Sequence, residues 1–165
     1  MRTMAFRFAV LAVCVVGLVG IAESKLSESL ETELQNATYI YVSSTRKDGS
    51  LSRPAEIWFF YQDDAVYLGT PPTSWRVKRI KAGRPDAKIW IGKPNGSSNY
   101  NASESDLKGL SSFEAKGSIV DDPKVQEAML EAYAKKYPGG WSKHEASFRN
   151  GFKDGSRVLV KYVPK

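Results

Sequence analysis

The sequence predicts a mainly β protein with α-helices, built as a small antiparallel barrel of about six strands with flanking helices. Three observations predict this class. Short segments rich in β-branched and aromatic residues recur between turn signals. Two segments with helical spacing of apolar residues interrupt the series of strands. No repeat at the period of a solenoid is present. Short strands with turn signals indicate a small barrel, closed so that its strand edges are paired.

The N-terminal residues form a separate segment. A short basic start precedes an uninterrupted apolar run over residues 8–22, and Gly20 and Ala22 stand where signal peptidase requires small residues. We therefore expect residues 1–22 to be a signal peptide. The remaining residues, 23–165, are expected to form a single domain in the periplasm or outside the cell.

Two alternatives concern the same segment. An uncleaved anchor would hold the protein at a membrane through its N-terminus alone, but the apolar run has 15 residues, short of the ~20 that a helix needs to cross a bilayer. The other alternative is lipidation of Cys14, which Val13 and the apolar residues that follow disfavour.

Composition limits the partners and the chemistry. The formal net charge is +6, and it falls to +4 when Arg2 and Arg7 leave with the signal peptide. This modest excess favours anionic ligands and does not indicate nucleic acid. The only cysteine, Cys14, lies in the leader, and His144 is the only histidine. Disulfides, thiol catalysis and a histidine-rich metal site are therefore excluded for the mature chain, and we expect His144 at the surface.

The first elements after the leader follow from spacing. Leu26, Leu30 and Leu34 lie four apart between acidic residues, which predicts a short amphipathic helix. The next three strands are expected to form an antiparallel meander, joined by a turn at Asp48–Gly49 and a second turn at 62–64. Across the whole chain, strands are expected at 38–45, 51–61, 65–70, 86–92, 111–120 and 156–163.

A basic helix follows the third strand. Val77 and Ile80 are three residues apart and surrounded by charges, which predicts about two helical turns within residues 73–83. Ser74 or Thr73 can cap the start of this helix, and Gly83 can end it.

The rest of the domain alternates strands with helices. Residues 93–106 read as a polar loop. Asp122 and Pro123 predict the start of a helix that continues to residue 138. Residues 144–152 are expected to form a short turn or helix before the last strand.

Three motifs in chain order resemble those of one known family. They are RKDGSLSRPAEIWFFYQDDAVYLGT, TPPTSWRVKRIKAGRPDAKIWI and FEAKGSIVDDPKVQEAMLEAYAKKYP. Residues 38–163 thereby resemble the FMN-binding split β-barrel family, the pyridoxamine 5′-phosphate oxidase-like proteins. The resemblance implies a split β-barrel, bound FMN, and a homodimer with two flavin sites at its interface.

The resemblance also implies a set of cofactor-binding residues. Arg53 and Arg76 would lie near the cofactor phosphate with the hydroxyls of Thr70 and Ser74, and Lys78 would lie close by. Ile57 and Trp58 would follow the isoalloxazine ring with their backbone, and Trp75 would cover the ring or anchor a dimer. No catalytic side chain is assigned.

Physical chemistry supports a phosphate site at the basic segment. A phosphate ester needs several donors, and arginine offers a planar fork of them beside the start of a helix. Two plainer interpretations stay open: the basic segment is a solvated helix face, and Trp58 belongs to the core. At most half of the aromatic residues in 58–61 can face a ligand, because side chains alternate along a strand.

The chain also departs from the family. The late Arg-x-His of pyridoxamine phosphate oxidases is missing, and the chain ends at Lys165. We therefore expect an FMN-dependent oxidoreductase acting on some other small molecule. The alternatives are an F420-binding reductase of the same fold and a non-enzymatic module that binds haem, with His144 as axial ligand, or another envelope partner.

Overall fold

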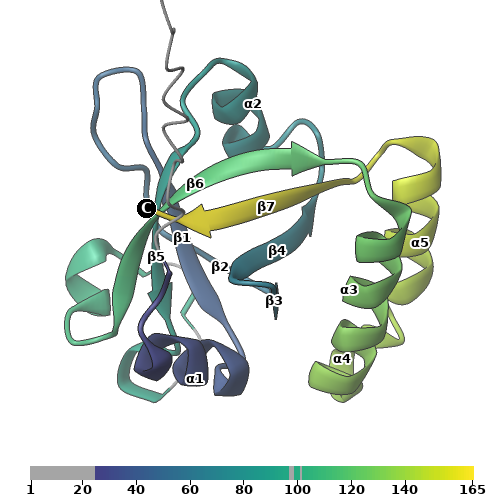
Figure 1. The fold of residues 1–165 in the computed structure, drawn as a ribbon, viewed down its shortest axis with the longest axis horizontal. Helices are drawn as coiled ribbons and strands as arrows, with labels where there is room; N and C mark the ends of the chain where they lie inside the picture. Colours follow the sequence, from purple (N-terminus) through teal and green to yellow (C-terminus); the bar gives the residue numbers. More distant parts are fainter. Residues whose placement is uncertain (1–24, 97–98, 101) are drawn as a thin grey trace, which may run out of the picture.

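A computed structural model describes residues 25–96, 99–100 and 102–165, which form one curled antiparallel sheet with helices around it (Figure 1). The strand order is β2-β1-β5-β6-β7-β4-β3. The strands are β1 (Ile40–Ser44), β2 (Ala55–Ile57), β3 (Phe60–Gln62), β4 (Ala65–Thr70), β5 (Asp86–Ile91), β6 (Ser112–Val120) and β7 (Val158–Pro164). The helices are α1 (Glu28–Asn36), α2 (Trp75–Lys81), α3 (Pro123–Lys136), α4 (Pro138–Trp141) and α5 (Glu145–Asp154), with short 3₁₀ turns at Pro94–Gly96 and Glu104–Leu107.

The two edges of the sheet are joined by a single stretch of chain. β2 and β3 are consecutive in the sequence, separated only by Trp58 and Phe59, yet they occupy opposite edges. The sheet must therefore curl until its edges meet, which makes a split barrel. The single strand predicted over 51–61 is thus wrong: β2 pairs with β1, β3 pairs with β4, and the expected three-strand meander is interrupted at this break.

Two tyrosines hold the break between β2 and β3: Tyr133 in α3 and Tyr137 directly after it. A backbone that leaves its ladder must find other hydrogen-bond partners. The Tyr133 hydroxyl donates to the Trp58 carbonyl at 2.7 Å. The Tyr137 hydroxyl accepts from the Phe59 N–H at 3.0 Å and lies 2.9 Å from the Thr38 carbonyl, to which it can donate. The Trp58 ring stacks on Tyr137 with centroids 4.4 Å apart.

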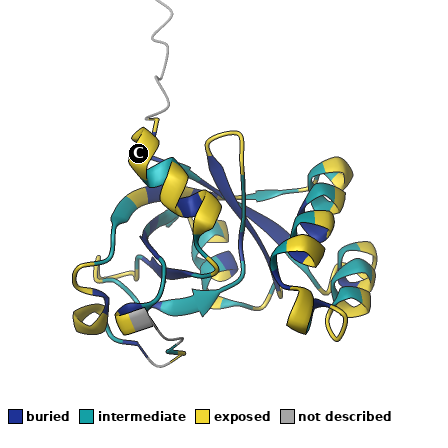
Figure 2. Ribbon diagram, turned by 90° about the horizontal axis from the view of Figure 1, so that it is seen from below, coloured by how far each residue is buried: buried dark blue, intermediate teal, exposed yellow. Residues whose placement is uncertain are grey.

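Apolar side chains fill both faces of the sheet. Along β4, Val66 and Leu68 point into the barrel, whereas Ala65 and Tyr67 face the helices. All six residues of β4 are buried, because one side of the strand faces the barrel interior and the other faces α3, α4 and α5 (Figures 1 and 2). α1 and α2 lie at opposite ends of the barrel (Figure 1).

The predicted helix boundaries are largely confirmed. The Asp122 carboxylate accepts from the N–H groups of Lys124 and Val125 at the start of α3. Gly83 ends α2 with a φ of 72°, a conformation that favours glycine. The segment expected as a turn or helix at 144–152 is the helix α5, and His144 precedes it at the surface.

The predicted signal peptide, residues 1–22, lies outside the described residues. Among the residues that are described, no helix has the length and apolar character to cross a membrane.

Removing the Tyr137 hydroxyl tests how the break is held. Tyr137→Phe leaves the buried Phe59 N–H without its acceptor, which should lower the free energy of unfolding by about 1–3 kcal/mol. Urea denaturation measures this change. Tyr100→Phe, at a side chain that is 74% exposed, is the control and should change stability little. Equal stability of both variants and the wild type would contradict this role for Tyr137.

Lys136 predicts a pH dependence of stability. Its Nζ lies 3.4 Å from the Phe59 ring centroid, and burial lowers its pKa to about 8. Between pH 8 and 10 the unfolded chain therefore binds more protons than the folded one, so this lysine makes the free energy of unfolding rise with pH. Lys136→Met should be more stable than the wild type at pH 7 and should flatten this rise.

Urea denaturation at pH 7, 8, 9 and 10 measures the effect of Lys136. Lys135→Met, at the exposed neighbouring position, is the matched control and should keep the wild-type slope. A Lys136→Met slope equal to that of the wild type would show that burial does not penalise the charge of Lys136.

Candidate functional site

The split between β2 and the β4–α2 connection contains two neighbouring cavities. β2 has a strand partner on one side only, β1, so its other edge faces this split. The first cavity, of about 380 Å³, is called the basic cleft, and its lining is Val42, Ser44, Arg46, Ser52, Arg53, Ala55, Ser74, Trp75, Arg76 and Arg79. The second, of about 200 Å³, is called the aromatic cavity, and its lining is Tyr39, Glu56, Ile57, Trp58, Gly69, Tyr100, Tyr133 and Phe148.

Arg76 is the most enclosed cation of the basic cleft. It extends from the first turn of α2, and its Nη1 donates to Thr70 Oγ1 at the end of β4 over 3.3 Å. Burial lowers the pKa of Arg76, which reflects the cost of removing its charge from water. No carboxylate among the described residues forms an ion pair with Arg76, so its positive charge is left unbalanced in that part of the chain.

Ser74 adds an unused hydroxyl beside Arg76. It precedes α2, but its side chain makes no capping bond. Its Oγ is buried and has no hydrogen-bond partner within the part of the chain that the structure describes. An unsatisfied buried hydroxyl is costly, and a ligand oxygen in the basic cleft would satisfy it.

Two further arginines, Arg46 and Arg79, line the basic cleft. The sequence patterns did not predict either of them as a site residue. Arg79 donates to the Ser44 carbonyl at 3.2 Å and also to the Ser44 hydroxyl. Burial, and then repulsion from Arg46 and Arg84, lower the pKa of Arg79. The spacing of three residues from Arg76 could have indicated Arg79, since such residues share a helix face. Arg46 reaches the cleft only through tertiary structure.

The aromatic cavity lies at the other end of β2. The Tyr133 ring meets the Trp58 ring edge-on, with centroids 6.0 Å apart. Glu56 is the only acidic residue of the lining, and its Oε2 accepts from the Tyr41 hydroxyl at 2.6 Å and from the Asn99 N–H at 3.0 Å. Phe148 lies 2.9 Å from where a Cβ on Gly69 would stand, so a side chain there would displace that ring.

The structure brings together most of the site residues that the sequence predicted. Four of them line the basic cleft: Arg53, Ser74, Trp75 and Arg76. Thr70 reaches it through its bond with Arg76. Ile57 and Trp58 line the aromatic cavity instead, where Trp58 also packs on the α3 tyrosines.

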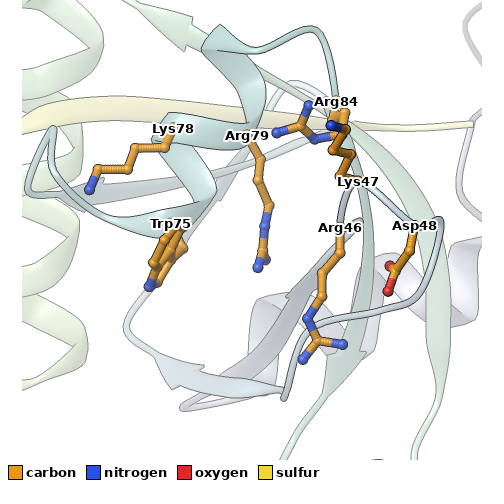
Figure 3. A pocket seen from close by; sticks show the side chains of 7 residues that line it. All are labelled: Arg46, Lys47, Asp48, Trp75, Lys78, Arg79 and Arg84. Atoms are coloured by element: carbon orange, nitrogen blue, oxygen red, sulfur yellow. The ribbon is translucent and has the colours of Figure 1, made fainter.

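Lys78 does not line the basic cleft, although its Nζ lies 5.0 Å from the Trp75 ring centroid. It lines a neighbouring open depression of about 620 Å³, here called the basic groove. Its lining is Arg46, Lys47, Asp48, Trp75, Lys78, Arg79 and Arg84 (Figure 3). Arg46, Trp75 and Arg79 line both the groove and the cleft.

The arrangement has the chemistry to hold a ligand with an anionic end and a flat apolar end. The basic cleft offers four arginines and three serines and no carboxylate among its lining residues. The aromatic cavity offers ring faces to a planar group. The described residues contain no group of histidine, cysteine, aspartate and glutamate side chains that could hold a metal ion.

Comparison with known proteins supports the fold. No family model matches the sequence, and no curated protein matches it. A putative pyridoxamine 5′-phosphate oxidase from Listeria innocua is 14% identical, with a TM-score of 0.54 over 83% of this chain and 91% of its own. HutZ, the haem storage protein of Vibrio cholerae, is 10% identical, with a TM-score of 0.57 over 86% and 92% of the two chains.

An F420 reductase structure is also similar, at 18% identity and a TM-score of 0.52 over 85% of this chain and 96% of its own. The chain therefore has the split-barrel fold of the pyridoxamine 5′-phosphate oxidase-like proteins, as the sequence predicted.

Inorganic phosphate tests the basic cleft without any cofactor. A ligand that binds only the folded state at ten times its Kd adds about 1.4 kcal/mol of stability, roughly 3–6 °C in Tm for a domain of this size. Arg76→Gln should lose most of this rise, which thermal denaturation at constant ionic strength measures. The control, Lys124→Gln on the exposed face of α3, should keep it. An equal rise in all three proteins would mean that the cleft binds no anion.

Proposed function

We propose that this protein binds FMN in the split between β2 and the β4–α2 connection and acts as an oxidoreductase on a small molecule. The observation that carries the proposal is the pairing of the basic cleft with the aromatic cavity along one strand, β2. FMN has a matching division, with a dianionic phosphate at one end and a flat ring system at the other.

The phosphate would be held by Arg53, Ser74 and Arg76. Arginine binds phosphate with parallel N–H donors, and charge-assisted bonds of this kind are about twice as strong as neutral ones. The unsatisfied Ser74 hydroxyl supplies a further donor. Because no described carboxylate pairs with Arg76, the phosphate would not have to displace an internal ion pair.

The ring system would lie against the open edge of β2. The backbone of Ala55, Glu56 and Ile57 belongs to an edge strand, and an edge strand presents N–H and C=O groups that can bond a polar heterocycle. The rings of Trp58, Tyr133 and Phe148 would shield that heterocycle from water. FMN, when bound, supplies hydride or electron transfer, so the protein need contribute only binding, orientation and a dry environment.

The proposal includes an assembly and a location. We propose a homodimer, because the split opens at the surface and a second copy would enclose a flavin bound there. Residues 1–22 would direct export, and the small net charge offers no reason to propose a nucleic-acid partner.

Two other cofactors have specific support. The basic groove beyond Trp75 could take the longer anionic tail of F420, and an F420 reductase shares the fold. Haem has support from the similarity to HutZ and from His144, whose ring lies 5.5 Å from that of Trp58 beside the aromatic cavity.

Replacing Arg76 tests the FMN proposal. The purified protein should show the two visible absorbance bands of a flavin, and Arg76→Ala should weaken FMN binding by about 1.5–3 kcal/mol, the range for hydrogen bonds to charged groups. Titration of the apoprotein, followed by flavin fluorescence, measures this loss. Lys81→Ala, on the exposed face of the same helix, should bind FMN as tightly as the wild type.

Other spectra would contradict FMN binding. A single near-violet band with strong fluorescence would identify F420. A haem spectrum that disappears in His144→Ala would identify haem. A colourless protein that takes up none of the three cofactors would leave a structural or partner-binding role.

A further inference from the structure

The basic groove has a composition that the proposed flavin site does not require. It lies between α2 and the turn at 46–50, and it shares Arg46, Trp75 and Arg79 with the basic cleft. Figure 3 shows Arg46 and Arg79 extending from these two elements into the same space, with Lys47 and Arg84 close together at one end and Lys78 at the other. Five cations and one carboxylate line the groove.

The cations of the basic groove are not neutralised within the described chain. None of the five takes part in an ion pair between described residues. The one carboxylate, Asp48, is engaged by the N–H and hydroxyl of Ser50. The Arg84 Nε is buried and finds no hydrogen-bond partner among the described residues. The groove therefore has an excess of positive charge and one buried N–H group, that of Arg84 Nε, without an acceptor. An oligoanion would balance the charge and accept from this group.

Trp75 adds an aromatic surface to this charge. Its side chain is 70% exposed, which is unusual for so large an apolar ring. Lys78 Nζ lies 5.0 Å from the ring centroid and the Arg79 guanidinium 5.9 Å from it. An exposed ring among cations is the combination that nucleotides use, because the base stacks on the ring while phosphates pair with the charges.

We propose that the basic groove binds a nucleoside di- or triphosphate, with its base on Trp75 and its phosphates among Lys47, Arg79 and Arg84. The aromatic ring and the positive charge together indicate this class of ligand. An inorganic oligophosphate has no base to stack on Trp75, and a nucleoside has no phosphate to pair with the cations. This site goes beyond the flavin site, and it would stand even if the split held no flavin. It shares Arg46, Trp75 and Arg79 with the cleft, so the two ligands would influence one another.

The first experiment separates ring from charge. Calorimetric titration of the purified full-length protein compares ADP with adenosine and with inorganic pyrophosphate. ADP should bind more tightly than either fragment, and its affinity should fall with added salt. Trp75→Leu should reduce ADP affinity about 5- to 150-fold, the range for stacking of one base, and leave pyrophosphate affinity nearly unchanged.

The second experiment places the nucleotide. Lys47 and Arg84 line the basic groove and not the cleft. The double variant Lys47→Gln/Arg84→Gln should weaken ADP and pyrophosphate binding at least about tenfold, since each charge-assisted bond contributes about that much. Lys124→Gln/Lys135→Gln removes the same charge from exposed positions on α3 and should keep wild-type affinity.

Repeating the ADP titration with Arg76→Gln excludes binding in the basic cleft. Affinity that survives this change and falls with Lys47→Gln/Arg84→Gln supports the groove. Affinity that is lost with Arg76→Gln but kept by Lys47→Gln/Arg84→Gln would place the nucleotide in the cleft and overturn the proposal. ADP binding no tighter than adenosine binding would overturn it as well.

Discussion

The interruption of the sheet at Trp58 and Phe59 is the constraint on which the rest of the structure depends. Only two residues separate β2 from β3, which occupy opposite edges of the sheet. Such a short connection can join the two edges only if the sheet curls until they meet. The same interruption leaves β2 without a second strand partner and opens the split between β2 and β4. Tyr133 of α3 and Tyr137 directly after α3 stabilise it through hydroxyls that bond the backbone at the break. Fold and candidate site thus share one structural cause.

The split gathers positive charge that the described chain does not balance. Arg76 is enclosed without an acidic partner, and repulsion between Arg46, Arg79 and Arg84 adds to the cost of burying these groups. Removing a charge from water without a partner costs stability. Such an arrangement is consistent with a protein whose folded state is completed by an anionic ligand, since a bound anion offsets that cost.

Sequence patterns predicted most of the fold because local chemistry determines most of it. Asp122 with Pro123 marked the start of α3, and Gly83 marked the end of α2. The division of 51–61 into β2 and β3 could not be predicted from the sequence, because its cause is tertiary. The hydroxyls that hold the break belong to Tyr133 in α3 and to Tyr137 directly after it, more than 70 residues away.

For the candidate site too, the residues of one local motif could be predicted from the sequence, and those placed by tertiary structure could not. Ser74 and Arg76 belong to one local motif and line one cleft, as predicted. Arg46 was missed because it belongs to a turn that only tertiary structure brings to α2. Lys78 was grouped with the phosphate site by its position in the chain, but the helix places it in the lining of the basic groove and not in that of the basic cleft. Sequence proximity therefore identified the helix and not the face that each side chain occupies.

The most direct test of phosphate recognition in the split compares FMN with riboflavin, which has the same ring system but no phosphate. Binding of both to the apoprotein is measured under identical ionic conditions. FMN should bind at least about 100-fold more tightly, because two or more charge-assisted hydrogen bonds of about 1.5–3 kcal/mol each would be lost with the phosphate. Equal affinity for the two flavins would contradict a phosphate site formed by Arg53, Ser74 and Arg76.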